Sequence, residues 1–262
     1  MPSSALHVAR TGLEAQDQRM RVIANNLANV GTTAFKRDRA NFATLAYQDA
    51  RVAGQQSSSE TAYATGLNLG TGVGIQSTTR IDSQGTLQTT NNALDLALDG
   101  EGFFQVSLPG GQLAYTRAGN FSRSATGQLV TAQGYVVQPA VTIPEGAISV
   151  TVANDGTVSA IVPGQTDPTQ LGQLTLASFA NPGGLKSMGD NFLTETAASG
   201  QAQLGAAGTQ GRGSIRQGML EASNVNVVEE LVDMIECQRA YEVNSKMISA
   251  VDEMLKNANQ TL

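Results

Sequence analysis

Few residues in this sequence could perform chemistry, and their spacing matches no catalytic site. His7 is the only histidine, so a serine–histidine–aspartate triad would depend on it, and a metal site with two histidine ligands is excluded. His7 falls on the polar side of a predicted helix, where a surface role is expected. Cys237 is the only cysteine, which excludes an intrachain disulfide and a cysteine-rich zinc site. We interpret Cys237 as a small buried hydrophobe.

Carboxylates are the remaining candidates for catalysis. Asp95 with Asp99, or Asp99 with Glu101, could form a pair of the glycosidase type. Gly100 and Gly102 beside them favour a turn, and the sequence has no tryptophan to stack against a sugar. We therefore expect turn and surface roles for these acids.

Two further motifs match binding sites only in part. Glu229, Asp233 and Glu236 fall on one helix face and could bind a cation, but they also suit a solvated face near the positive end of a helix dipole. The segment Gly70–Gly74 lacks the G-x-G-x-x-G spacing of a dinucleotide loop, because Ile75 occupies the last glycine position. The sequence therefore predicts no enzyme, no metal site and no cofactor.

The composition favours a structural protein with a β-rich part. The chain has 262 residues, of which 15% are charged, 5% are aromatic and 28 are glycine. Its net charge of −6 argues against nucleic-acid binding, which needs a basic surface. No stretch approaches the ~20 apolar residues of a membrane span. Charged residues from Arg10 to Arg21 interrupt the N-terminal region, so we expect no cleaved signal peptide.

The sequence predicts a long helix at each end of the chain, and these helices carry the predicted packing surface. Apolar residues recur every seven positions within residues 4–29 and 227–258, which predicts two amphipathic helices in a coiled-coil-like pair. The second helix carries an apolar arc of roughly 180°, whereas one partner helix needs about 100°. The spare surface either packs against other copies or is covered by the middle of the chain. The predicted subunit-packing residues are Leu6, Leu13, Met20, Ile23, Leu27, Val227, Leu231, Met234, Tyr241, Met247, Ile248, Val251, Met254 and Leu255.

The middle of the chain is predicted to be antiparallel β structure. Residues 148–152 and 157–162 flank Asn154-Asp155-Gly156, a hairpin signature. The polar run from Arg51 to Thr65 has no period, and we expect it to be extended or mobile until it meets a partner. The predicted fold class is α+β. The predicted domains are a terminal helical core of residues 1–42 and 216–262, an extended insert of 43–80, and a β-rich outer domain of 81–215.

Three segments carry signatures of a known family. Residues 24–37 (ANNLANVGTTAFKR) resemble the N-terminal signature of bacterial flagellar rod and hook proteins, although Ala34 stands where glycine is common in that family. Residues 223–242 resemble the matching C-terminal signature, and residues 91–106 resemble the strand entry of the same family. The residues that carry the terminal motifs are Asn25, Asn26, Leu27, Asn29, Phe35, Lys36, Ser223, Asn224, Asn226, Glu229 and Glu230.

The resemblance implies a structural subunit of a helical tube whose inside is lined by the terminal helices. Chain length and the polar insert favour the distal part of the flagellar rod over the proximal rod and the hook. Such a rod crosses the periplasm in the basal body and transmits motor torque to the hook. The implied partners are other copies of the chain, proximal rod proteins, the hook protein, the peptidoglycan- and outer-membrane-ring proteins, and the flagellar type III export apparatus. The rival hypothesis is a secreted carbohydrate-binding β protein with a carboxylate pair in an open cleft.

Overall fold

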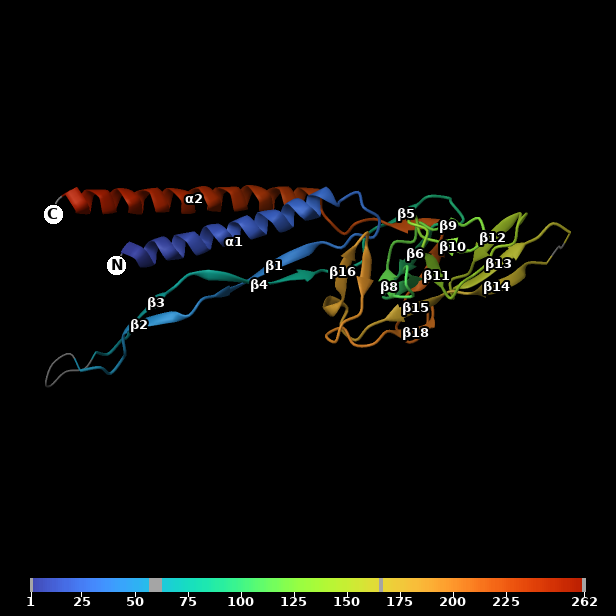
Figure 1. Cartoon of the computed structure of the whole chain (residues 1–262), viewed down its shortest axis with the longest axis horizontal. Helices are drawn as coiled ribbons and strands as arrows, with labels where there is room; N and C mark the ends of the chain where they lie inside the picture. Colours follow the sequence, from blue (N-terminus) through green and yellow to red (C-terminus); the bar gives the residue numbers. More distant parts are fainter. Residues whose placement is uncertain (1, 57–62, 165–166, 261–262) are drawn as a thin grey trace. The chain divides into compact units, whose positions relative to one another are not determined.

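A computed structural model describes residues 2–56, 63–164 and 167–260 of the chain (Figure 1). Helices α1 (Pro2–Ala28) and α2 (Val227–Gln260) begin and end these described residues, and strands occupy the region between them. The α+β class is therefore confirmed. The chain forms two compact units, one of residues 1–28, 38–79 and 226–262 and one of residues 29–37 and 80–225.

These two units have different bounds from the predicted domains. Residues 38–79 group with the terminal helices, and residues 29–37 group with the β-rich unit. The predicted ranges, 1–42 with 216–262, 43–80 and 81–215, stay a prediction about how the chain divides in an assembly. Below, the helical unit and the β-rich unit are the two compact units.

Both helices follow from local sequence. Asn226 caps α2, because its side-chain Oδ1 accepts a hydrogen bond from the amide of Val228 at 3.1 Å. Glu229 and Glu230 lie in the first turn, where negative charge is favourable. The ends of both helices lie within two residues of the expected bounds, 4–29 and 227–258.

The two helices run antiparallel along each other in the helical unit (Figure 1). Cys237 Sγ donates to the carbonyl oxygen of Gln16 at 3.1 Å, and Asn26 contacts Glu230 further along. Residue numbers therefore rise in α1 as they fall in α2. Cys237 is buried, as predicted, and burial raises the pKa of its thiol.

Two strand pairs form the rest of the helical unit. Strand β1 (Asp38–Thr44) pairs with β4 (Val73–Arg80), and β2 (Tyr47–Arg51) pairs antiparallel with β3 (Leu67–Gly70). The described strands of this region pair with each other, which was not predicted, and the extended insert of residues 43–80 stays a prediction. Residues 57–62, at the centre of the predicted polar run, lie outside the described residues.

The strands contact α1 through Thr11. The amide of Val73 donates to Thr11 Oγ1 at 3.4 Å. A Cβ at Gly72, which has φ of +116°, would lie 2.1 Å from the same oxygen. Only glycine allows this close approach at that backbone conformation.

The β-rich unit contains sixteen strands and one short 3₁₀ turn among its described residues. They are β5 (Leu87–Thr89), β6 (Leu96–Asp99), β7 (Phe103–Ser107), β8 (Leu113–Thr116), β9 (Ser122–Arg123), β10 (Leu129–Val130), β11 (Val136–Gln138), β12 (Ser149–Val152), β13 (Thr157–Ile161), β14 (Thr169–Gln173), β15 (Thr175–Ser178), η1 (Pro182–Gly184), β16 (Lys186–Gly189), β17 (Phe192–Thr194), β18 (Gln203–Ala206), β19 (Ser214–Gln217) and β20 (Met219–Glu221).

The strands of this unit pair antiparallel, as predicted. The largest sheet has the order β16-β17-β8-β7-β11-β10-β9, and β15 joins it by pairing with β7 and β18. Strands β12, β13 and β14 form a second sheet, and β19 with β6 and β20 with β5 form two-stranded pairs. The predicted hairpin at Asn154-Asp155-Gly156 is confirmed, because it connects β12 to β13.

The core lies on both sides of β7. Phe104 and Val106 belong to the larger apolar cluster, where the Phe104 ring meets the edge of Phe121 at 5.1 Å between centroids. Phe103 points to a smaller cluster with Tyr115 and Phe179. A strand covered on both faces forms a rigid centre for the unit.

Candidate functional site: an exposed helix face and a buried charge cluster

The predicted packing residues of the helical unit fall into two groups. In α1, Ile23 is buried and Leu6, Leu13, Met20 and Leu27 are half-buried. In α2 the half-buried members are Met234, Ile248, Val251 and Leu255, and the exposed members are Val227, Leu231, Tyr241, Met247 and Met254. Their role in subunit packing stays a prediction.

Four apolar side chains near the start of α2 form an exposed surface, and only Leu231 among them is a predicted packing residue. Val228 is 70% exposed and Val232 is 52% exposed, and Leu231 and Ile235 lie exposed beside them. At 100° per residue these four side chains span about 100°, on the side of α2 that faces away from Cys237. We call them the exposed α2 face. No described segment of the chain covers this face.

Asn26, a residue of the N-terminal motif, is buried where α1 meets both α2 and β1. Its Nδ2 donates to the carbonyl oxygen of Asp38 at 2.9 Å and to both carboxylate oxygens of Glu230 at 3.3 Å. Its Oδ1 accepts from the amide of Asp38 at 2.9 Å. Glu230 is also buried. A motif residue from each end of the chain therefore contributes to one polar contact inside the helical unit.

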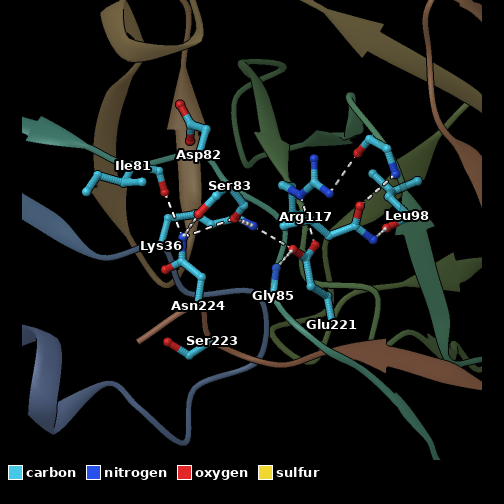
Figure 2. Close-up of polar contacts among 12 residues, drawn as sticks. Lys36, Ile81, Asp82, Ser83, Gly85, Leu98, Arg117, Glu221, Ser223 and Asn224 are labelled. Atoms are coloured by element: carbon cyan, nitrogen blue, oxygen red, sulfur yellow. Dashed lines mark hydrogen bonds and ion pairs between the residues drawn. The ribbon is translucent and has the colours of Figure 1, made fainter. Parts of the chain in front are cut away.

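A buried charge cluster of Lys36, Arg117 and Glu221 lies in the β-rich unit (Figure 2). Glu221 Oε1 accepts from Lys36 Nζ, and its Oε2 accepts from Arg117 Nε at 2.9 Å. The side chain of Glu221 is fully buried, and those of Lys36 and Arg117 are at most 7% exposed. Such charges persist in a protein interior only when each is paired and hydrogen-bonded.

Backbone groups complete the charge cluster. Lys36 Nζ donates to the carbonyl oxygen of Ser83 at 2.7 Å, and the amide of Gly85 donates to Glu221 Oε1 at 2.9 Å. Arg117 donates to the carbonyl oxygens of Gly100 and Gly102. The cluster thus ties residues near both ends of the β-rich unit to its interior.

The pKa values of the cluster reflect burial and mutual attraction. Burial alone would raise the pKa of Glu221, but the charge of Arg117 and the hydrogen bond from Lys36 outweigh it, so this pKa lies below its usual value. Burial lowers the pKa of Lys36, and the hydrogen bond to Glu221 opposes that effect. Two cations around one carboxylate therefore hold Glu221 ionised.

Asn224 makes a second set of contacts beside the charge cluster (Figure 2). Its Oδ1 accepts from the amide of Arg37 at 2.8 Å. Its Nδ2 donates to the carbonyl oxygens of Ile81 at 2.8 Å and Ser83 at 3.0 Å, and to Ser83 Oγ at 3.0 Å. One side chain therefore connects segments far apart in the sequence.

The other motif residues are exposed or half-buried. Asn25, Asn226 and Glu229 are exposed, and Asn29, Phe35 and Ser223 are half-buried. Arg117 and Glu221 were not predicted as site residues, although both are central to the charge cluster. The motif did include Lys36 and Asn224.

Ala34 has a left-handed backbone conformation, with φ of +57°. It is buried, and its amide donates to the carbonyl oxygen of Glu221 at 2.8 Å. A non-glycine residue pays about 1–2 kcal/mol for this conformation. The departure from glycine noted at this position therefore has a physical cost in the structure.

Ala34→Gly is expected to leave the free energy of unfolding unchanged or to raise it by up to about 1 kcal/mol, because glycine removes the left-handed penalty. Ala97→Gly is the matched control, since Ala97 is buried in β6 and glycine there should cost about 1 kcal/mol. Urea unfolding of both variants measures the difference. Equal losses in the two variants would contradict the expectation.

The structure gives no support to the candidates for catalysis. His7 is exposed, as predicted, and Asp99 pairs with Arg216 at 3.1 Å on the surface. Within the described residues, no group of three acidic, histidine or cysteine side chains could hold a metal ion. Neither α1 nor α2, as described, combines the length and apolar composition of a membrane-crossing helix.

A cavity of about 410 Å³ in the β-rich unit is a candidate for a carbohydrate cleft. Amide and hydroxyl side chains dominate its lining, and Asp190 is the one carboxylate among the lining residues. Phe192, their one aromatic residue, is only 5% exposed, so its ring offers no stacking face. The cavity has neither the carboxylate pair nor the platform that the rival hypothesis requires.

Sequence comparisons place these features in one family. Residues 6–36 match the family model for the flagella basal body rod protein, residues 97–160 that for the flagellar hook protein FlgE/F/G D1 domain, and residues 216–261 that for the flagellar basal body rod FlgEFG protein C-terminal region. Lys36, Arg117 and Glu221 fall one in each matched segment, so the charge cluster joins all three.

Several full-length relatives are named FlgG. The flagellar basal-body rod protein FlgG of Buchnera aphidicola subsp. Acyrthosiphon pisum is 50% identical over 256 residues, covering 98% of each chain. FlgG of Caulobacter vibrioides is 48% identical over 98% of each chain, and that of Bacillus subtilis is 37% identical over 96%. These matches confirm the resemblance, and because the family is structural they confirm that the chain is not an enzyme. The chain belongs to the FlgG family of flagellar basal-body rod proteins.

Proposed function

We propose that the chain polymerises through its terminal helices into the distal rod, a rigid helical tube that transmits motor torque across the periplasm to the hook. The observation that carries this proposal is the exposed α2 face, an apolar surface that no described segment of the helical unit covers. Val228, Leu231, Val232 and Ile235 present the 100° arc that one further helix can bury. Monomeric proteins seldom leave such a patch in water.

Burial of this face supplies a driving force for assembly. Apolar surface contributes about 25 cal/mol per Å², so a few hundred Å² per contact supplies several kcal/mol before ordering costs. A contact between different surfaces of identical chains continues into an open helix when its rotation does not close into a ring. A tube built this way repeats the contact along its length, which suits a shaft under torque.

The coiled-coil-like arrangement of the terminal helices belongs to the same proposal. In the helical unit α1 covers the side of α2 that contains Cys237, and a neighbouring copy would cover the exposed α2 face. The residues predicted for subunit packing, from Leu6 in α1 to Leu255 in α2, would then divide between the internal contact and contacts with other copies. This arrangement would place the helices on the inside of the tube.

Family membership supports assembly with other rod and hook proteins, since the matched models span the rod and hook families. We propose proximal rod proteins and the hook protein as axial neighbours. We also propose the peptidoglycan- and outer-membrane-ring proteins as surroundings, and export through the flagellar type III apparatus without a cleaved signal. A distal position is favoured over a proximal rod or hook position because the chain spans 98% of relatives named FlgG.

Deletion of the gene tests the proposed function in the bacterium that carries it. Cells lacking the chain are expected to build basal bodies that stop short of the hook and to lose swimming, and the full chain supplied in trans should restore both. Electron microscopy of isolated basal bodies and a soft-agar swimming assay provide the measurements. Complete rods in the deletion strain would contradict the proposal, and complete rods without hooks would instead support a hook subunit.

A further inference from the structure

The chain passes between its two compact units four times, at residues 28/29, 37/38, 79/80 and 225/226. Within the β-rich unit, the segments beside the last three of these crossings meet around Asn224. These covalent crossings transmit force between the units. The contacts that hold the crossings together therefore decide how many crossings share that force.

Asn224 forms the first layer of these contacts. The segment at 35–37 reaches it through the Arg37 amide, and the segment at 80–83 reaches it through the carbonyl groups of Ile81 and Ser83. The amide of Ile81 also donates to the carbonyl oxygen of Arg37 at 2.9 Å. Each of the three segments is therefore hydrogen-bonded to the other two.

Glu221 forms a second layer from the same three segments. It accepts from Lys36 on the first segment, while Lys36 also donates to Ser83 on the second. Arg117 binds the other carboxylate oxygen of Glu221 and connects this layer to the interior of the β-rich unit. All three charged side chains are buried, so water competes little for these bonds.

We propose that Asn224 and Glu221 form a crossing clamp with Lys36, Arg37, Ile81 and Ser83, which fixes three chain crossings to one another so that they carry force together. Asn224 and Glu221 are positioning residues in this clamp. The clamp is a property of a single subunit, and its mechanical use rests on the proposed function. A chain without it would pass force through each crossing separately.

Amide hydrogen exchange on the full-length chain tests the clamp directly. Asn224→Ala is expected to speed exchange of the Arg37 and Ile81 amides by about tenfold or more, since the hydrogen bonds of the Asn224 side chain are lost and the segments separate together. The amides of β7 should not change. Asn181→Ala is the matched control, because Asn181 also donates its side chain to a backbone carbonyl, at Ala198, outside the clamp.

Asn224→Asp distinguishes the acceptor contact of the Asn224 side chain from its donor contacts. Aspartate keeps the acceptor for the Arg37 amide, but it replaces the donor by an oxygen that faces the carbonyl oxygens of Ile81 and Ser83. The Arg37 amide is expected to stay protected while the Ile81 amide exchanges about tenfold faster. This variant also decides the outcome if Asn224→Ala does not fold. Unchanged exchange of the Arg37 and Ile81 amides in the variants that fold would overturn the clamp.

Assembled rods report the mechanical role separately. Rods of Asn224→Ala are expected to form but to bend more, with a shorter bending persistence length in electron micrographs than rods of Asn181→Ala. Equal stiffness in the two would overturn the force-sharing role. If the wild-type chain builds no rods, the proposed function fails while the exchange experiment still decides whether the clamp exists.

Discussion

Glu221→Gln is expected to lower the free energy of unfolding of the β-rich unit by about 3–5 kcal/mol, because it leaves Lys36 and Arg117 buried without a counter-charge. Glutamine has nearly the same shape, so the loss would come from charge and not from packing. Denaturant unfolding monitored by tyrosine fluorescence or by circular dichroism measures it. Asp99→Asn is the matched control, since Asp99 and Arg216 form an exposed pair that contributes at most about 1 kcal/mol.

The pH dependence gives an independent check on the same residue. The folded-state pKa of Glu221 lies below the ordinary value of 4.5, so its contribution to stability is present above pH 4.5 and is lost as the pH falls below that value. The stability difference between the wild type and Glu221→Gln should therefore be largest near neutral pH and should shrink in acid. A difference that stays constant from pH 7 to pH 3 would show that Glu221 is not the ionised centre of the cluster.

Val232→Asp is expected to abolish assembly while leaving the folded subunit intact. Val232 is 52% exposed, so aspartate there stays in water in the free subunit and should change its stability by no more than about 0.5 kcal/mol. In a subunit contact the same carboxylate would be buried without a partner, at a cost of about 3 kcal/mol or more. Each contact would then weaken by about 100-fold.

Sedimentation and electron microscopy measure this second effect. Ser249→Asp provides the control, because it adds the same charge to an exposed position of α2 about 26 Å along the helix from Val232. The control should form filaments at the wild-type concentration. Filaments of Val232→Asp at that concentration would show that the exposed α2 face is not a subunit contact.

The sequence was sufficient for the parts of the fold that have a regular period or a local turn signal. Heptad spacing predicts the two terminal helices, and Asn154-Asp155-Gly156 predicts the hairpin between β12 and β13. These features depend on neighbours within a few residues. The pairing of β1 with β4 was missed because their sequences lack the alternation that marks a half-covered strand, and both are largely half-buried or exposed.

The buried charge cluster could not be found in the same way. Glu221 lies 185 positions from Lys36 and 104 positions from Arg117, and no spacing rule connects them. Of the three residues, only Lys36 was named from the sequence, as a residue of the N-terminal motif. Only the tertiary structure shows that this lysine is buried and that a single carboxylate neutralises both cations.

Strands β5 and β20 have a consequence for how the protein can vary. They pair directly, with Leu87 opposite Glu221, and the amide of Thr90 donates to the carbonyl oxygen of Gly218 at 2.8 Å. Residues 90–218 therefore begin and end at neighbouring positions in the β-rich unit. A fluorescent reporter inserted into an exposed turn of this stretch, with Arg117 and the strands retained, should therefore leave the flanking ends and the charge cluster in place.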